Sequence, residues 1–171
     1  MYPPHLVAPM RAQLTDNGFT SLETAEAVDN FMANAKGTTL VVVNSVCGCA
    51  AGAARPGVVG ALNYSELKPD NLVTVFAGVD GDATAKMRDY LLPYPPSSPS
   101  IAIFKDDELV HFIERHHIEG RNAQMIGEHL VMAFEEFCGE KASYSYKLPG
   151  PVPLVVVLNA APPLRKMVSN E

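Results

Sequence analysis

A continuous run of β-branched and apolar residues, Thr38 to Val43, constrains the fold of this chain more than any other feature. The run lacks the alternation of polar and apolar side chains that marks a strand with one face in water, so it predicts a strand buried on both faces. A second run of this kind, Leu72 to Val79, follows along the chain. Strands covered on both faces need helices above and below the sheet, so the two runs predict a layered α/β fold.

The surrounding segments predict where those helices lie. Five segments have helical spacing or composition: Met10–Asn17, Leu22–Lys36 with Thr20 and Glu23 as a capping box, the small-residue segment from Cys49 to about Leu62 with a bend near Pro56, Asp82–Leu92, and Asn122–Phe137. The Asp106–Asp107 turn predicts a hairpin between Ser100–Phe104 and Glu108–Ile113. Strands alternate with helices first and an antiparallel pair comes last, which predicts a three-layer fold with a central mixed sheet and helices on both faces.

The length of 171 residues suits one domain with a sizeable core. We assign that domain to residues 1–138, because the composition changes afterwards. Residues 139–171 form a proline-rich extension around one apolar run, Leu154–Leu158. This run predicts one added strand at a sheet edge, in its own chain or in a second copy, so the extension is the expected route to any homo-oligomer.

Charge and hydropathy exclude several classes of partner. The net charge is −6 and no basic run is present to neutralise phosphates, which argues against nucleic acid. No apolar run approaches the roughly 20 residues that cross a bilayer. The N-terminal segment MYPPHLVAPMRAQL lacks the features of a secretory signal. We therefore expect a cytoplasmic protein that binds neither nucleic acid nor membrane.

Two of the three cysteines, Cys47 and Cys49, are one glycine apart where the first strand runs into the small-residue segment. Structural disulfides are rare in the cytoplasm, so a close pair indicates redox or metal chemistry. Extended residues i and i+2 lie ~6.5–7 Å apart, whereas a disulfide needs Cα atoms ~4.4–6.8 Å apart. The chain must contract at Gly48, and the resulting bridge should be strained and easily reduced.

The position of Cys47 before a helix favours its thiolate, since the positive end of the helix dipole stabilises negative charge. Cys47 is then the nucleophile of disulfide exchange, and Cys49 attacks the mixed disulfide that forms on it. Asn44 and Ser45 are candidates for hydrogen bonds to the sulfurs. Arg55, about two turns into the helix, is either a local cation for the site or a surface residue, and we expect it at the surface.

Two other interpretations of the pair stay open: small buried hydrophobes, or a metal site completed by His116 and His117. Cys138, at the end of the last helix, is expected to be a core or helix-end residue.

Four segments are similar to the bacilliredoxin family: TTLVVVNSVCGCAAGAARPGV, LVTVFAGVD, YPPSSPSIA and VHFIERHHIEG. The resemblance covers roughly Leu6 to Cys138. It implies a thioredoxin-like fold with a CxC active site that removes bacillithiol from mixed disulfides on proteins, or that isomerises disulfides. It gives the nucleophile role to Cys47 and the resolving role to Cys49, and it says nothing about residues 139–171.

Candidate substrate-binding residues come from two later segments. Pro99, which follows Ser98, matches the cis-proline that faces the active site in thioredoxin-like proteins. Arg115, His116 and His117 follow the second hairpin strand, which should end on the same side of the sheet as the cysteines. There they would hold an anionic substrate or stabilise a thiolate, unless they form a solvated polar loop.

Three functions are therefore under consideration. The first is a thiol–disulfide oxidoreductase acting on S-thiolated proteins and a low-molecular-weight thiol. No G-x-G-x-x-G follows a strand, so we expect no bound organic cofactor, and the electrons must come from another thiol or a reductase. The second is a metal-binding or carrier module that uses Cys47 and Cys49, and the third is a non-catalytic thioredoxin-like interaction protein.

Overall fold

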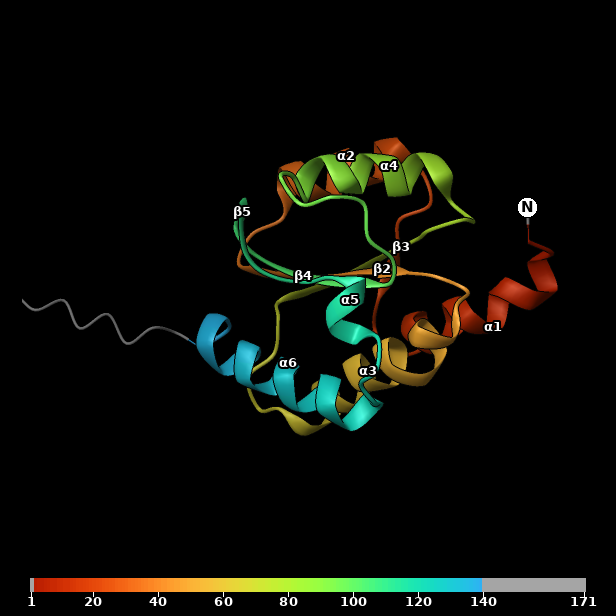
Figure 1. Cartoon of the computed structure of the whole chain (residues 1–171). Helices are drawn as coiled ribbons and strands as arrows, with labels where there is room; N and C mark the ends of the chain where they lie inside the picture. Colours follow the sequence, from red (N-terminus) through yellow and green to blue (C-terminus); the bar gives the residue numbers. More distant parts are fainter. Residues whose placement is uncertain (1, 140–171) are drawn as a thin grey trace, which may run out of the picture. The chain divides into compact units, whose positions relative to one another are not determined.

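The computed structural model describes residues 2–139, and its centre is the buried strand that the sequence predicts (Figure 1). All seven residues of β2, Thr38–Asn44, are buried. The other strands are β1 (Thr20–Ser21), β3 (Asn71–Phe76), β4 (Ser100–Lys105) and β5 (Glu108–Ile113). They form one sheet in the order β1-β3-β2-β4-β5. Because β1, β3 and β2 run parallel and β4 and β5 are antiparallel to their neighbours, the sheet is mixed, as expected.

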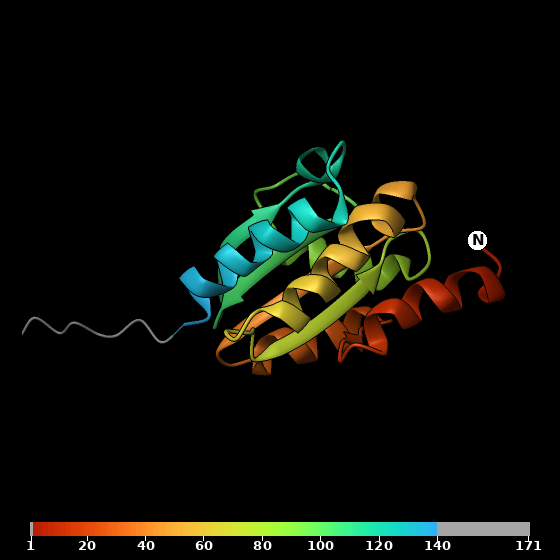
Figure 2. The ribbon, with the colours of Figure 1, turned by 90° about the horizontal axis from the view of Figure 1, so that it is seen from below.

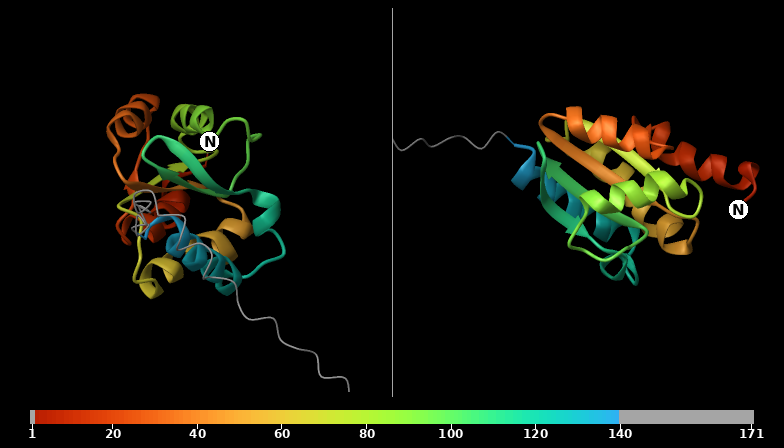
Figure 3. Two further views of the ribbon diagram at one scale, coloured as in Figure 1. Left: turned by 90° about the vertical axis from the view of Figure 1, so that its left-hand side faces the viewer. Right: turned by 90° about the horizontal axis from the view of Figure 1, so that it is seen from above.

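Helices cover both faces of this sheet (Figure 1). α2 (Ala25–Asn34) and α4 (Gly81–Tyr90) lie side by side on one face, seen from above in Figure 3. α1 (Pro4–Thr15), α3 (Arg55–Tyr64) and α6 (Ala123–Phe137) lie on the other face, where α3 and α6 run alongside each other (Figure 2). A π-helix, η1 (Ala50–Ala54), leads into α3, and the short α5 (Arg115–Ile118) joins β5 to α6. The three-layer α/β prediction is confirmed.

Alternate side chains of β2 enter two separate cores. Leu40 and Val42 pack with residues of α3 and α6 in one apolar cluster. Val41 and Val43 pack with residues of α2 and α4 in the other. Each large apolar side chain that is fully buried contributes about 1.5–3 kcal/mol to the hydrophobic stabilisation. The central strand is therefore fixed from both sides, and so is the position where it ends.

Two predicted helix starts are wrong. The second helix begins at Ala25 and not at Leu22, because the Thr24 hydroxyl caps it by accepting a hydrogen bond from the Ala27 N–H at 3.1 Å. Thr20, predicted to lie in a capping box, is instead a residue of β1, where it pairs with Val73 of β3. The first helix begins at Pro4 rather than Met10 and contains Pro9 in its interior.

The small-residue segment is helical, as predicted, but its irregularity comes before Pro56. The turns of Ala50–Ala54 are widened into a π-helix, and Pro56 lies in the first turn of α3, directly after it. The strand expected at Leu154–Leu158 lies outside the described residues. Of the helices within residues 2–139, none has the length and apolar character that a bilayer span requires.

Candidate active site

Cys47 lies just beyond the end of the central strand, at the start of a helix. β2 ends at Asn44, and helical backbone begins at Gly48. The Cys47 carbonyl accepts hydrogen bonds from the N–H groups of Ala50 at 3.1 Å and Ala51 at 3.2 Å, so Cys47 caps the first turn. Its side chain therefore lies at the positive end of the helix dipole, which is the position that the sequence predicts.

The surroundings of Cys47 favour its thiolate. Burial by itself raises the pKa of the Cys47 thiol, but the hydrogen bond from Ser45, the backbone N–H groups of Ala50 and Cys49, and the charge of Arg115 outweigh it and lower the pKa. The Ser45 hydroxyl lies 3.1 Å from the Cys47 sulfur. The suggested hydrogen bond from Ser45 is thus present, and it is the largest of the favourable contributions.

The surroundings of Cys49 instead favour its protonated thiol. Burial, the negative charge of the Cys47 thiolate and the hydrogen bond to that thiolate raise the pKa of the Cys49 thiol. Both cysteines are free and partly exposed, and Cys49 also contacts the core beneath α3 and α6. One helical turn therefore holds one thiol that ionises easily and a second that retains its proton, which is the division of roles required for a nucleophile and a resolving thiol.

Arg55 was expected at the surface and is instead the largest fully buried side chain of the described residues, with 2% of its surface exposed. Its Nη1 donates to the Ser45 carbonyl at 2.8 Å and to Asn44 Oδ1 at 3.0 Å. Its Nε donates to Gln13 Oε1 at 2.6 Å. The expectation is wrong because the π-helix turns Arg55 toward the end of β2. There Gln13 of α1, 42 positions earlier in the chain, accepts one of its hydrogen bonds.

The loop that contains Pro99 lies at the same end of the sheet. The Ser98–Pro99 peptide bond is cis, as the family resemblance implies. Val43, near the end of β2, pairs with Ser100, the first residue of β4. The antiparallel register therefore brings Ser98 and Pro99 beside the segment that carries Cys47.

α5 attaches to this loop. The backbone N–H of Arg115 donates to Ser97 Oγ at 2.7 Å, and its Nη1 donates to the Ser98 carbonyl at 3.2 Å. Its Nε also pairs with Glu119 at 2.6 Å. The hydrogen bond and charge of Glu119 and the negative charge of Cys47 raise the pKa of Arg115, so it stays cationic beside the thiols. Arg115–Ile118 is a short helix rather than a loop, and Arg115, His116 and His117 are exposed on it.

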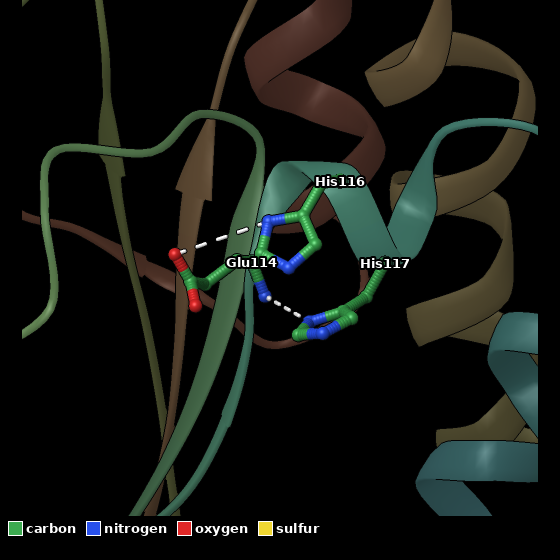
Figure 4. A group of neighbouring side chains, drawn as sticks. All are labelled: Glu114, His116 and His117. Atoms are coloured by element: carbon green, nitrogen blue, oxygen red, sulfur yellow. Dashed lines mark hydrogen bonds and ion pairs between the residues drawn. The ribbon is translucent and has the colours of Figure 1, made fainter.

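Figure 4 shows that Glu114 contacts both histidines of α5, His116 and His117. The Glu114 backbone N–H donates to His117 Nδ1 at 3.2 Å, and its carboxylate lies 4.0 Å from His116 Nδ1. Within residues 2–139, these are the only three side chains that come close enough together to share a metal ion. Cys47 and Cys49 are not part of this group, so the structure does not bring the histidines and the cysteines into one ligand set.

A shallow pocket of about 440 Å³ lies along the cis-proline loop and α5. It is lined by Pro95, Pro96, Ser97 and Ser98 of the loop, by Glu114, Arg115, His116 and Glu119, and by Arg88 of α4. Three of the predicted substrate-binding residues, Ser98, Arg115 and His116, therefore line one depression, and Pro99 is not part of its lining. Arg88 and Ser97 were not predicted: Arg88 stands in no recognisable motif, and Ser97 lies in the segment YPPSSPSIA but was assigned no role.

Cys138 is remote from this site. It caps the end of α6, and burial raises the pKa of its thiol, while a hydrogen bond to Thr38 acts in the opposite direction. Thr38 begins β2, whereas Cys47 follows its end, and seven strand residues span roughly 20 Å. Cys138 is thus a helix-end residue, as expected.

Comparisons with known proteins agree with this geometry. A family model described as disulphide isomerase matches residues 2–138. A bacilliredoxin of Cytophaga hutchinsonii is 62% identical over 136 residues, which cover 80% of this chain and 99% of the relative. A bacilliredoxin of Halalkalibacterium halodurans is 56% identical over 137 residues, which cover 80% of this chain and 94% of the relative.

A solved structure supports the fold alone. Oxidised thioredoxin O2 of Arabidopsis thaliana superposes with a TM-score of 0.50 at 14% identity, covering 72% of this chain and 97% of that one. The fold is thioredoxin-like, and the described residues present the CxC pair at the start of a helix after the central strand. The chain belongs to the bacilliredoxin family of thioredoxin-like thiol–disulfide oxidoreductases.

Proposed function

We propose that this protein removes a low-molecular-weight thiol from mixed disulfides on other proteins, with Cys47 as nucleophile and Cys49 as resolving thiol. The observation that carries the proposal is the placement of the Cys47 sulfur 3.1 Å from the Ser45 hydroxyl at the start of a helix, with a second thiol two residues away. The names of the relatives support bacillithiol as the small thiol.

The exchange proceeds in two attacks. The Cys47 thiolate attacks the small thiol's sulfur in the mixed disulfide, and the substrate protein's thiol leaves as a thiolate that takes up a proton. Cys47 then carries the small thiol. Cys49 loses its proton, attacks the Cys47 sulfur and releases the small thiol, leaving a Cys47–Cys49 disulfide. Two equivalents of a reducing thiol, or a thiol reductase, supply the two electrons that reopen this disulfide.

The pKa shifts fit this order. While Cys47 is a thiolate, its negative charge helps to hold the pKa of Cys49 high. Once Cys47 is capped, that charge is gone, so Cys49 ionises more readily at the step that needs its thiolate. The same pair can instead attack and return a protein disulfide, which is the isomerase activity that the description of the family suggests.

The substrate is proposed to approach along the pocket beside α5. Ser98 and Pro99 present backbone next to Cys47, while Arg115 and His116 offer donors for an anionic group of the small thiol. We place the reaction in the cytoplasm, where reducing thiols that regenerate the pair are abundant.

Intact-protein mass spectrometry of three serine variants, after incubation with a protein–bacillithiol mixed disulfide, tests the assignment. Cys49→Ser should remove bacillithiol once and remain capped by it. Cys47→Ser should be inactive, and Cys138→Ser, the matched control for loss of a thiol, should behave as wild type. If Cys47→Ser retains activity and becomes the trapped species, the roles are reversed. If every variant stays active, the pair is not the site.

A parallel assay with a protein carrying scrambled disulfides separates the two activities. A reductase of mixed disulfides leaves the scrambled protein unchanged, whereas an isomerase restores its native pairing without net reduction.

A further inference from the structure

Arg55 carries a charge into the interior without a carboxylate to balance it. The structure gives it three hydrogen-bond acceptors: Gln13 Oε1, Asn44 Oδ1 and the Ser45 carbonyl. All three are neutral. Among residues 2–139, no carboxylate oxygen lies within 4.0 Å of its guanidinium. A buried charge is costly unless it is paired, so this placement needs an explanation beyond packing.

Two of the three partners of Arg55, Asn44 and Ser45, belong to the segment that positions the nucleophile. Asn44 Oδ1 accepts a hydrogen bond from the Ser45 N–H at 2.9 Å as well as from Arg55. The Ser45 carbonyl accepts a second bond from Arg55, and the Ser45 hydroxyl contacts the Cys47 sulfur. Arg55 therefore holds the peptide group after Ser45 directly and the one before it through the Asn44 side chain, so it restrains the backbone that carries the Ser45 hydroxyl.

The π-helix is what brings Arg55 to this place. η1 fills residues 50–54, so Arg55 is the first residue after it. A π-turn uses more residues per turn than an α-helix, so it rotates every following side chain about the helix axis. Such turns are rare and occur mostly at functional sites. Here the turn directs Arg55 beneath the strand end.

We propose that Arg55 is a positioning residue and the buried counter-charge of the Cys47 thiolate. It acts through the Asn44–Ser45 turn and through its own positive charge, which stabilises the thiolate relative to the thiol and to the disulfide. Burial lowers the pKa of Arg55, and the negative charge of Cys47 acts in the opposite direction. Arg115 is the cation that lowers the pKa of Cys47 directly, so the hydrogen bonds of Arg55 to the Asn44–Ser45 turn carry the proposal. The proposal rests on Cys47 being the exchange nucleophile, and it adds the group that sets its reactivity.

The test measures the pH dependence of Cys47 alkylation by iodoacetamide in the full chain, with each cysteine resolved by peptide mass spectrometry. Arg55→Met should raise the pKa of Cys47 by at least about one unit, which lowers the thiolate fraction about tenfold at any pH well below the pKa. Arg55→Lys keeps the charge and should lie between Arg55→Met and wild type. Arg121→Met removes an exposed cation and is the matched charge control, with an unchanged profile.

Gln13 supplies a second test that leaves Arg55 in place. Gln13→Glu offers Arg55 a carboxylate and should draw its charge away from Cys47, so the pKa of Cys47 rises. Gln13→Ala removes the same hydrogen bond without adding charge and should leave the pKa near the wild-type value. If Arg55→Met does not fold, the difference in the Cys47 pKa between Gln13→Glu and Gln13→Ala tests the proposal in its place.

The reduction potential provides an independent readout. A thiolate that is less stable makes the reduced form less favourable, so Arg55→Met should be the weaker oxidant, by about 30 mV for each tenfold change in the exchange equilibrium. If Arg55→Met and Gln13→Glu both keep the wild-type alkylation profile and potential, the proposal is overturned, and Arg55 is only a structural residue. That result would leave the trapping behaviour of Cys49→Ser intact, so failure of this inference is distinguishable from failure of the proposed function.

Discussion

Gly57 packs against Ile126 so closely that a β-carbon at position 57 would lie 2.8 Å from the Ile126 side chain. The same β-carbon would lie 2.9 Å from the Ala123 carbonyl oxygen, which is backbone and cannot turn aside. This contact sets the distance between α3, the helix that follows the candidate active site, and α6.

Gly57→Ala should therefore destabilise the protein by about 1–3 kcal/mol, because the two helices must separate to accommodate the methyl group. Gly60→Ala is the matched control on the same helix, since a β-carbon there meets nothing within 4 Å. That control should be neutral or stabilising by up to about 1 kcal/mol, because alanine favours the helix. Urea unfolding measures both, and equal free energies of unfolding for the two variants would refute the close packing.

Ser45→Ala should slow disulfide exchange near neutral pH and restore it at alkaline pH. The Ser45 hydroxyl provides the largest favourable contribution to the lowered pKa of Cys47, so its loss raises that pKa. Each unit of increase removes about tenfold of the thiolate at a pH well below the pKa. The pH profile of Cys47 alkylation measures this shift, and Ser65→Ala, distant in the chain at the end of α3, is the control. A uniform loss of rate at all pH values would indicate damage to the fold.

The Cys47–Cys49 disulfide should be easy to reduce. The CxC loop is short, and the surroundings of Cys47 stabilise the reduced form, so both effects raise the potential. Equilibration with glutathione should give a value between about −120 and −270 mV. A potential below about −300 mV, as in stable structural disulfides, would contradict the redox role.

The stability of the protein should decline as the pH falls from neutrality. The Nε2 atoms of His111 and His129 lie 2.9 Å apart, and burial, followed by neighbouring positive charge, lowers the pKa of each imidazole. The unfolded chain therefore binds more protons just below its own histidine pKa of about 6.5. The contribution of the pair is fully present above that value and is lost as the pH falls through the folded-state pKa values.

His129→Gln should flatten this dependence by more than half, because only one partly buried imidazole remains and the charge of His129 no longer lowers the pKa of His111. His5→Gln, at an exposed position in α1, is the control and should keep the full slope. Free energies of unfolding across a pH series check the prediction, and an unchanged slope in His129→Gln would assign the dependence to other groups.

The sequence allowed the centre of the fold and the position of Cys47 before a helix to be predicted, because local signals define them. A β-branched run marks β2, and the small residues after Cys47 mark a helix start. The hairpin also followed from its turn, and its antiparallel strands placed Arg115 at the end of the sheet that holds the cysteines; the irregularity in register between Ile103 and Phe104 was not predicted.

Arg55 was mispredicted for the opposite reason. Its burial depends on a π-helix with no known sequence signal and on Gln13, which lies 42 positions earlier in the chain. β1 and α5 were missed because two and four residues are too few to show a period. Arg88 lines the pocket from α4, and only the tertiary structure shows that this part of α4 lies beside the cis-proline loop.

The central place of β2 has a consequence for the labelling chemistry of Cys47. The strand pairs with β3 and β4, and both come later in the chain. The groups that activate the sulfur, Ser45, the helix start and Arg115, converge only when these strands are in register. A chain that is still emerging from the ribosome, or one held open by denaturant, therefore carries an ordinary thiol at position 47. Rapid alkylation of Cys47 thus reports the fraction of molecules that are folded, and the protein contains its own probe of the native state.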